Sequence, residues 1–375
     1  MEFRLEPNQA PATDARRDEI LAAPGFGQYF TDHMVTVDWT ADLDAQKAAF
    51  EAGDYLNMAG DWSNARVEPY GPLSMDPASA VLHYAQEIFE GLKAYRHDDG
   101  SIWTFRPYAN AARMNRSAHR MAMPQLPEDV FVKGVEQLMA QDRAWVPNGA
   151  GQSLYLRPFM IATEIFLGVR PAREFSFHII ASPAGNYFGA ELKPVSIWVS
   201  REFARAGEGG TGSAKFGGNY AASLAGQLQG ASRGHDQVIF LDRSPNDSLE
   251  ELGGMNVFFV TKDNKLITPK LTGTILEGIT RNSLMQLGEE FGLDVQERHI
   301  TFNEWKDGVA TGEISEVFAC GTAAVLTPIG RVADGDEVYE TPSQDFPVST
   351  ALRNRLVGIQ TGAEKDTYGW MHRLA

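Results

Sequence analysis

The chain has 375 residues, of which 43% are hydrophobic and 22% are charged, a balance that excludes a disordered, collagen-like or coiled-coil protein. Asp and Glu (49) outnumber Lys and Arg (33), giving a net charge of −16. Nucleic acids and anionic membranes are therefore poor candidates as partners. A single cysteine, Cys320, excludes intrachain disulfides and multi-thiolate zinc sites, and we predict no metal site. No stretch of 18 apolar residues and no signal-peptide pattern are present, so a cytoplasmic protein is expected.

The N-terminal half is expected to mix strands and helices after a peripheral start. Residues 1 to about 60 carry no long periodic run and are predicted to be peripheral. A hairpin is predicted from two β-prone runs around a turn that ends in Gly100. Pro107 is expected at a first helical position. The predicted elements are strands at 92–96, 101–105, 154–163 and 175–181, and helices at 111–123 and 127–144.

The C-terminal half shows the same alternation. Residues 182–189 are dense in turn formers and are predicted to begin an interdomain linker. The predicted elements are strands at 195–200, 238–242, 257–261 and 317–320, a glycine-rich loop at 207–218 and a helix at 280–291. We therefore expect an α/β (α+β) fold with a small domain at 1–181, a linker at 182–194 and a large domain at 195–375.

The glycine-rich loop carries the clearest chemical signal. Six glycines lie among residues 207–218, with Lys215 between Ala214 and Phe216. Such backbone approaches another group closely or adopts positive φ. A partly desolvated lysine there would be a nucleophile toward aldehydes. A flexible surface loop is the alternative, whereas a nucleotide-binding P-loop fails because Ser213 stands where its lysine is required.

Three further segments combine glycine with polar residues. Thr280 is predicted to cap a helix whose free N–H groups attract an anion. Glu250 and Glu251 precede two glycines and a buried strand, and Thr322 follows a strand end. The ordinary alternatives are a plain capped helix, two solvated acids and a simple strand exit.

Two arginines occupy unusual positions. Arg106 follows an aromatic strand, and Arg157 lies in the apolar run 154–158. A charge in such a run is costly unless it is paired, so Arg157 is expected to meet a bound carboxylate. A structural salt bridge is the alternative.

Taken together, these segments resemble the branched-chain amino-acid aminotransferases, which are fold type IV pyridoxal-phosphate enzymes of the class IV aminotransferase family. The resemblance extends from about residue 30 to near the C-terminus, and the motifs occur in matching order. They are FEGLKAY (89–95), FRP (105–107), LYLRP (154–158), the 207–220 loop, ELGGMN (251–256), GITR (278–281), GTA (321–323) and GWMHR (369–373).

The resemblance implies a role for each matching residue. Lys215 looks like the lysine that forms the internal aldimine with pyridoxal 5′-phosphate and shuttles the proton. Glu251 looks like the partner of the pyridine nitrogen, and Tyr220 like that of the phenolic oxygen. The implied phosphate ligands are Arg106, Gly278, Ile279, Thr280 and Thr322. The implied substrate contacts are Tyr84, Phe89, Tyr155, Arg157, Tyr187, Gly254 and Ala323, with Arg157 receiving the distal carboxylate of glutamate.

The resemblance also implies the reaction: branched-chain L-amino acids (Leu, Ile, Val) and 2-oxoglutarate give branched 2-oxo acids and L-glutamate. It further implies a homodimer, with the cofactor between two α/β domains.

This sequence departs from the family pattern at two places. Gly254 replaces a threonine found in some relatives. Ala324 and Thr327 replace a redox cysteine pair, so no thiol switch is expected. The alternatives are a D-amino-acid aminotransferase, an aminodeoxychorismate lyase, or a non-enzymatic phosphate-binding module.

Overall fold

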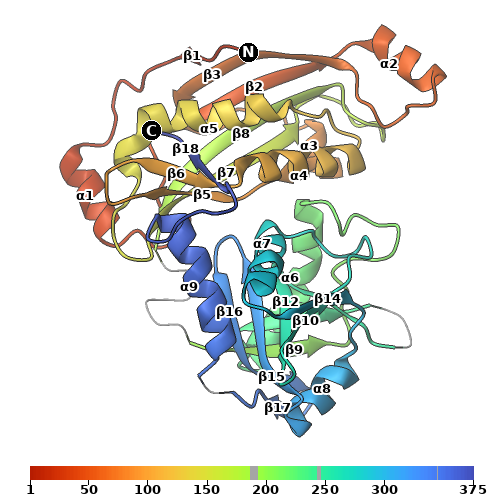
Figure 1. The fold of residues 1–375 in the computed structure, drawn as a ribbon. Helices are drawn as coiled ribbons and strands as arrows, with labels where there is room; N and C mark the ends of the chain where they lie inside the picture. Colours follow the sequence, from red (N-terminus) through yellow and green to blue (C-terminus); the bar gives the residue numbers. More distant parts are fainter. Residues whose placement is uncertain (186–192, 243–245, 344) are drawn as a thin grey trace. The chain divides into compact units, whose positions relative to one another are not determined.

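The computed structural model describes residues 1–185, 193–242, 246–343 and 345–375. The chain divides into two compact units, each with its own sheet. Unit 1 comprises Met1–Tyr187, Ala214–Gly217 and Gln360–Ala375, and unit 2 comprises Phe188–Ser213 and Gly218–Ile359. The predicted mixed α/β fold class is confirmed (Figure 1).

The elements of unit 1 are β1 (Arg4–Leu5), α1 (Asp14–Ala22), β2 (His33–Ala41), α2 (Leu43–Glu51), β3 (Gly60–Pro69), α3 (Ala80–Tyr84), β4 (Glu87–Phe89), β5 (Leu92–Arg96), β6 (Ile102–Phe105), α4 (Pro107–Arg120), α5 (Glu128–Asp142), the 3-10 turn η1 (Arg143–Trp145), β7 (Ser153–Ala162), β8 (Glu174–Ala184) and β18 (Met371–Arg373).

The sheet of unit 1 has the order β1-β3-β2-β8-β7-β5-β6-β18, with β4 paired to β7. Its pairs are antiparallel, except that β1 runs parallel to β3. Helices α4 and α5 lie along one face (Figure 1). On that face Val37 and Trp39 of β2 join Phe177 of β8 and Phe131 of α5 in the core. Burial of such side chains stabilises the fold by roughly 1.5–3 kcal/mol each.

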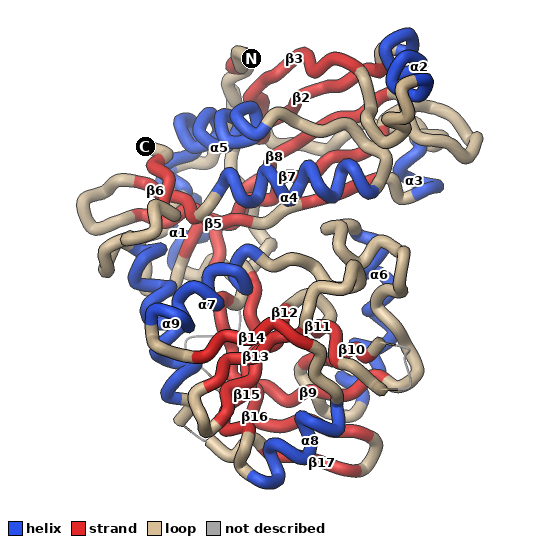
Figure 2. Tube along the Cα trace, turned by 45° about the vertical axis from the view of Figure 1, so that its right-hand side comes forward, coloured by secondary structure: helices blue, strands red, loops and turns tan. Residues whose placement is uncertain are grey.

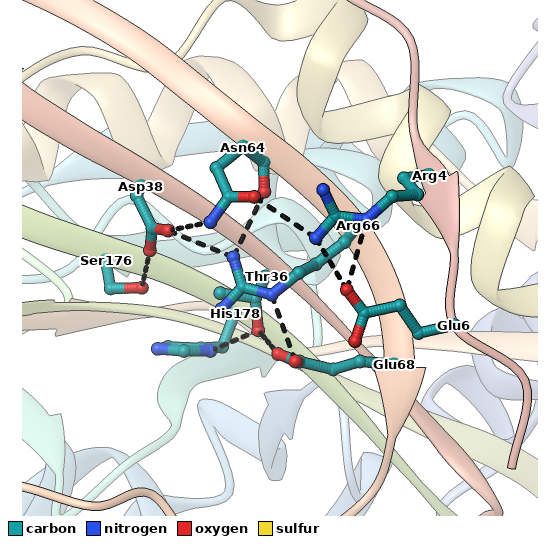
Figure 3. A network of polar contacts seen from close by, with 9 residues as sticks. All are labelled: Arg4, Glu6, Thr36, Asp38, Asn64, Arg66, Glu68, Ser176 and His178. Atoms are coloured by element: carbon teal, nitrogen blue, oxygen red, sulfur yellow. Dashed lines mark hydrogen bonds and ion pairs between the residues drawn. The ribbon is translucent and has the colours of Figure 1, made fainter.

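The other face of this sheet carries polar side chains. Figure 3 shows Arg66 of β3 bonded to both Asp38 and Glu68, while Thr36 donates to Glu68. His178 of β8 bonds Thr36 through Nδ1 at 3.0 Å. Burial lowers the pKa of His178 to about 4. Successive side chains of β2 therefore point alternately into the apolar core and into this polar network.

The elements of unit 2 are β9 (Val195–Ser200), α6 (Gly217–Ser232, beginning at the last residue of a unit 1 segment), β10 (Gln237–Leu241), β11 (Leu249–Leu252), β12 (Asn256–Thr261), β13 (Lys265–Pro269), α7 (Ile279–Glu290), β14 (Asp294–Arg298), α8 (Phe302–Thr311), β15 (Ile314–Gly321), β16 (Val325–Asp334), β17 (Glu337–Glu340) and α9 (Pro347–Thr361, whose end belongs to unit 1).

The sheet of unit 2 is mixed, with the order β11-β10-β9-β16-β15-β12-β13-β14 and β17 paired to β16. Strand β9 runs parallel to both of its neighbours, whereas β12 and β15 are antiparallel. Figure 2 shows its strands in red, with α8 among the surrounding helices. Phe259 and Trp305 contact edge to face in the core, with ring centroids 5.3 Å apart.

Several predicted elements are confirmed. The hairpin at 92–105 is β5 and β6, and Pro107 is the first residue of α4. The prediction of a peripheral start is wrong, because β2 lies between β3 and β8 in the unit 1 sheet and its Val35 and Val37 are fully buried.

The observed units depart from the predicted boundaries at three points. Ser182–Ala184, expected to begin the linker, continue β8, and residues 186–192 of the predicted linker lie outside the described residues. Ala214–Gly217 and Gln360–Ala375, placed by prediction in the large domain, pack with unit 1. The C-terminal segment does so because β18 pairs with β6 and completes that sheet.

Candidate functional site

The segment that carries Lys215 is tied to unit 1 by backbone hydrogen bonds. The Lys215 carbonyl accepts from the Phe89 N–H at 3.0 Å, and the Lys215 N–H donates to Ser117 Oγ of α4 at 2.9 Å. Two residues on, the Gly217 N–H donates to Glu87 at 2.6 Å. The lysine is half-buried, with Nζ 4.8 Å from the centre of the Phe89 ring. The segment is thus fixed in place rather than a loose surface loop.

One face of the unit 1 sheet gathers several predicted site residues around this lysine. Tyr155, Arg157 and Phe159 alternate along β7, and Phe89 of β4 pairs directly with Phe159. Alternate residues of a strand, and residues directly paired across strands, point to the same face. The Tyr155 hydroxyl lies so near Gly91 that a Cβ there would be 2.1 Å from it. Any larger residue at position 91 would therefore displace the Tyr155 hydroxyl.

Arg157 is held by rings and a hydroxyl rather than by a carboxylate. Its guanidinium lies 4.8 Å from the centre of the Phe89 ring and 5.3 Å from that of Tyr155, and Nη2 donates to the Tyr155 hydroxyl at 3.1 Å. Its buried Nε has no hydrogen-bond partner. Among the described residues no carboxylate lies within the 4.0 Å of an ion pair with Arg157. The alternative of a structural salt bridge therefore finds no support.

Glu251 in unit 2 is buried, with 2% of its surface exposed. Its Oε1 accepts from the Leu276 N–H at 2.8 Å and forms an ion pair with Arg205. Arg205 also donates to the carbonyls of Thr274, at 2.6 Å, and Gly212, at 3.0 Å. Solvated acids, the alternative for this motif, are excluded. Arg205 was missed in the sequence, where its position before the glycine-rich loop was the available signal.

Arg205→Leu is expected to destabilise unit 2, because Glu251 would remain buried without its cation. Breaking a buried ion pair by removing one partner costs roughly 3–5 kcal/mol. The matched control is Arg201→Leu, whose side chain is 43% exposed and pairs with Asp334 at 2.7 Å; exposed pairs contribute about 0–1 kcal/mol. Urea denaturation measures both. Equal shifts in the two midpoints would contradict a special role for the buried pair.

The N-terminus of α7 is built by glycine and a buried asparagine. Gly278, not Thr280, is the N-cap, and no side chain caps the helix. The prediction of Thr280 as N-cap is wrong, since Thr280 lies inside the first turn. A Cβ on Gly278 would be 2.1 Å from Asn256 Oδ1, and Asn256 Nδ2 donates to the Leu276 carbonyl at 3.0 Å. This first turn suits an anion such as phosphate.

Strand pairing brings two more predicted segments together in unit 2. Asn256 pairs with Cys320, so Gly254 lies near the end of β15, where a Cβ on Gly321 would be 3.7 Å from the Gly254 carbonyl. Thr322 and Ala323 form the turn into β16 and are half-buried. A Cβ on Gly254 would lie 3.3 Å from the Tyr220 ring.

Cys320 itself is unsuited to a thiol switch. It is a free, fully buried cysteine, and burial raises its pKa to about 12. The thiol therefore stays protonated and unreactive at neutral pH.

The remaining predicted residues belong to unit 1 or lie outside the description. Arg106 has φ 49° and ψ 49° and lies between β6 and α4. This left-handed conformation costs a non-glycine residue about 1–3 kcal/mol and is concentrated at functional sites. Tyr84 donates its hydroxyl to the Leu167 carbonyl, and no described contact joins it to Lys215. Tyr187 lies outside the described residues.

Each unit therefore assembles part of the predicted site. Unit 1 gathers Lys215, Phe89, Tyr155 and Arg157, and unit 2 links Glu251 to the segment before α7 through Leu276. Within the described ranges, no cluster of three or more His, Cys, Asp or Glu residues has the arrangement of a metal site. None of the described helices has the length and apolar character needed to cross a bilayer.

Comparisons with known proteins agree with this arrangement. The family model "Amino-transferase class IV" matches residues 87–332. The chain is 53% identical to a branched-chain-amino-acid aminotransferase of Mycolicibacterium smegmatis, over 100% of this chain and 98% of that protein.

Solved structures show the same likeness. A branched-chain amino acid aminotransferase of Escherichia coli superposes with a TM-score of 0.72 and 27% identity, covering 82% of this chain and 97% of that one. The branched-chain aminotransferase of the archaeon Thermoproteus uzoniensis, solved with norvaline, gives a TM-score of 0.71 at 25% identity, covering 83% and 97%. The chain belongs to the class IV aminotransferase family, among the branched-chain-amino-acid aminotransferases.

Proposed function

We propose that this enzyme transfers the amino group of branched-chain L-amino acids (Leu, Ile, Val) to 2-oxoglutarate, giving branched 2-oxo acids and L-glutamate, with pyridoxal 5′-phosphate as cofactor. The observation that carries the proposal is the placement of Lys215 in unit 1. A half-buried amine is fixed by its own backbone on an aromatic face that also holds Arg157.

The residues present fit the cofactor. Lys215 has the amine that a cofactor aldehyde requires, and the buried Glu251 carboxylate suits a protonated pyridine nitrogen. The N-terminus of α7 begins at Gly278, which lies against Asn256, and its free backbone N–H groups suit a phosphate. When bound, pyridoxal 5′-phosphate supplies the electron sink that makes amino-group transfer possible.

The chain's own residues hold the reactants and move the proton. We assign phosphate contacts to Arg106, Gly278, Ile279, Thr280 and Thr322, and the phenolic oxygen to Tyr220. Glu251 would hold the ring nitrogen in its protonated form, and its own position is fixed by Arg205. Lys215, once its amine is free, takes the proton from the substrate Cα as a general base and returns it as an acid.

The substrate face combines apolar walls with one cation. Phe89, Tyr155 and Tyr84 would accept a branched aliphatic side chain, and Tyr187 is assigned to the same wall. Arg157 would meet the distal carboxylate of glutamate. Backbone N–H groups of Gly254 and Ala323 would bind the α-carboxylate. Identity of 53% over the whole chain to a branched-chain enzyme favours this assignment over a D-amino-acid aminotransferase or an aminodeoxychorismate lyase.

We also propose a cytoplasmic homodimer. A chain with one buried, unpaired cysteine suits a reducing compartment. Leu82, Ile165, Leu167 and Val169 of unit 1 are large apolar side chains with more than half of their surface exposed, as expected of residues that a second copy covers. Light scattering would give the mass in solution.

The test of the function is spectroscopic. Purified enzyme with pyridoxal 5′-phosphate should be yellow, and leucine should bleach the absorbance until 2-oxoglutarate restores it. Borohydride should remove the colour and leave the reduced cofactor on Lys215 in a peptide mass map. Protein that stays colourless with added cofactor would be a non-enzymatic phosphate-binding module, and the proposal would fail.

A further inference from the structure

The substrate face holds a carboxylate that the proposed function leaves unused. Glu87 precedes Phe89 by two residues on β4, so both point to the face that carries Arg157. Its side chain is half-buried, and Oε1 accepts the Gly217 N–H at 2.6 Å. A Cβ on Gly217 would be 2.2 Å from the same oxygen. The carboxylate is thus fixed on the segment that carries Lys215.

Glu87 and Arg157 interact without direct contact. Arg157 bonds Tyr155 and lies over the Phe89 ring, and no ion pair within 4.0 Å joins it to a described carboxylate. The charge of Arg157 nevertheless acts on Glu87. Burial raises the pKa of Glu87, while the Gly217 N–H and Arg157 hold it down. Its protonation therefore responds to any change in the charge near Arg157.

Several other titratable groups of the described residues lie on or beside this face. Nearest are Tyr155 and Arg157 of β7, Lys93 opposite Tyr155 on β5, and Lys215. His178 stacks on Phe159 with ring centroids 4.9 Å apart, and through Thr36 it joins the network of Arg66, Asp38 and Glu68, while Glu174 of the same strand is exposed. Asp38 and Glu68 are already paired with Arg66, each at 3.0 Å, and Glu90 with Arg113 of α4 at 2.7 Å. Among these described carboxylates, Glu87 is therefore the half-buried one without an ion-pair partner on which Arg157 acts.

The proposed reaction requires the charge around Arg157 to change between its two substrates. The same pocket must take leucine, which brings no side-chain charge, and glutamate or 2-oxoglutarate, which brings a carboxylate to Arg157. We propose that Glu87 is the proton-linked counter-ion of Arg157: ionised when a branched-chain substrate is bound, and protonated from solvent when a dicarboxylate occupies Arg157. This inference rests on the proposed function and concerns the specificity of the same pocket.

The sign of the pH dependence follows. A ligand carboxylate at Arg157 cancels the attraction that held the pKa of Glu87 down, so that pKa rises and a proton is taken up. Binding of 2-oxoglutarate is therefore constant below the pKa of Glu87 in the free enzyme and weakens above it, by up to about tenfold per pH unit for one proton. Leucine binding carries no such proton uptake.

Calorimetry of the holoenzyme tests the inference directly. Glutarate and 4-methylpentanoate serve as unreactive probes, each titrated in two buffers of different ionisation enthalpy between pH 6 and 9. Glutarate should bind with uptake of up to one proton, and 4-methylpentanoate with none. In Glu87→Gln, which keeps an oxygen for the Gly217 N–H, the uptake on glutarate binding should disappear. The control Glu174→Gln, an exposed acid of β8, should behave like the wild type.

Steady-state kinetics provide the second measurement. The KM for 2-oxoglutarate should rise with pH in the wild type and stay flatter in Glu87→Gln, whereas the KM for leucine should increase severalfold in that variant. Equal proton uptake in Glu87→Gln and wild type, or parallel KM profiles, would overturn the counter-ion role while transamination continued. Absence of any leucine-dependent transamination in the wild type would instead overturn the proposed function.

Discussion

Lys215→Ala is expected to abolish amino-group transfer and leave both units folded. The lysine is joined to unit 1 through backbone groups, namely its carbonyl to Phe89 and its N–H to Ser117. Removal of its side chain therefore spares the bonds that fix the segment. Loss of a positioned acid–base group alone typically costs about 10²–10⁴-fold in rate, and the proposed covalent bond to the cofactor would be lost as well.

Stopped-flow absorbance and steady-state assays measure this loss, and far-UV circular dichroism reports the fold. Added methylamine should restore part of the rate, because a free amine can replace the missing proton carrier. Lys47→Ala, at an exposed lysine of α2, is the matched control and should retain full activity. Substantial turnover by Lys215→Ala with unchanged dichroism would move the catalytic role to another residue.

Local patterns predicted the elements whose signal lies in their own residues. The turn before Ser101 and the proline that begins α4 act over a few positions, and both were predicted correctly. Strand β2 was missed although Val35, Val37 and Trp39 alternate with Thr36 and Asp38. It lies within the segment of residues 1 to about 60 that was predicted to be peripheral. Thr36 and Asp38 belong to a polar network with Arg66, Glu68 and His178, which come from other strands (Figure 3). Such partners are brought together only by the sheet.

In the candidate site, too, residues with a local motif were predicted and contacts between distant segments were not. Lys215, Glu251 and Arg157 stand in motifs, so their positions could be recognised from sequence. The burial of Glu251 could not, because it depends on Arg205, 46 residues earlier, and on the Leu276 N–H. The N-cap is Gly278 and not Thr280, and a side chain at residue 278 would collide with Asn256 of β12. Neither contact has a local signature.

Arg157→Leu is expected to separate the two substrates. Glutamate and 2-oxoglutarate should lose roughly 2–4 kcal/mol of binding free energy, as for a charge left without its partner in a partly buried site. Leucine should be little affected, since it makes no ion pair there. The variant should also keep its fold, because Arg157 bonds only the Tyr155 hydroxyl among the described residues and rests on aromatic faces that a leucine can still contact.

Single-turnover absorbance of each half-reaction, at varied leucine and varied glutamate, measures the separation. An equal loss for both substrates would show that Arg157 acts structurally. The double variant Glu87→Gln, Arg157→Leu sharpens the test, because two groups that share one charge balance have non-additive effects. Once Arg157 is absent, substitution of Glu87 should no longer alter the pH dependence of 2-oxoglutarate binding. Additive effects in the double variant would mean that the two side chains act independently, and the counter-ion role of Glu87 would then be excluded.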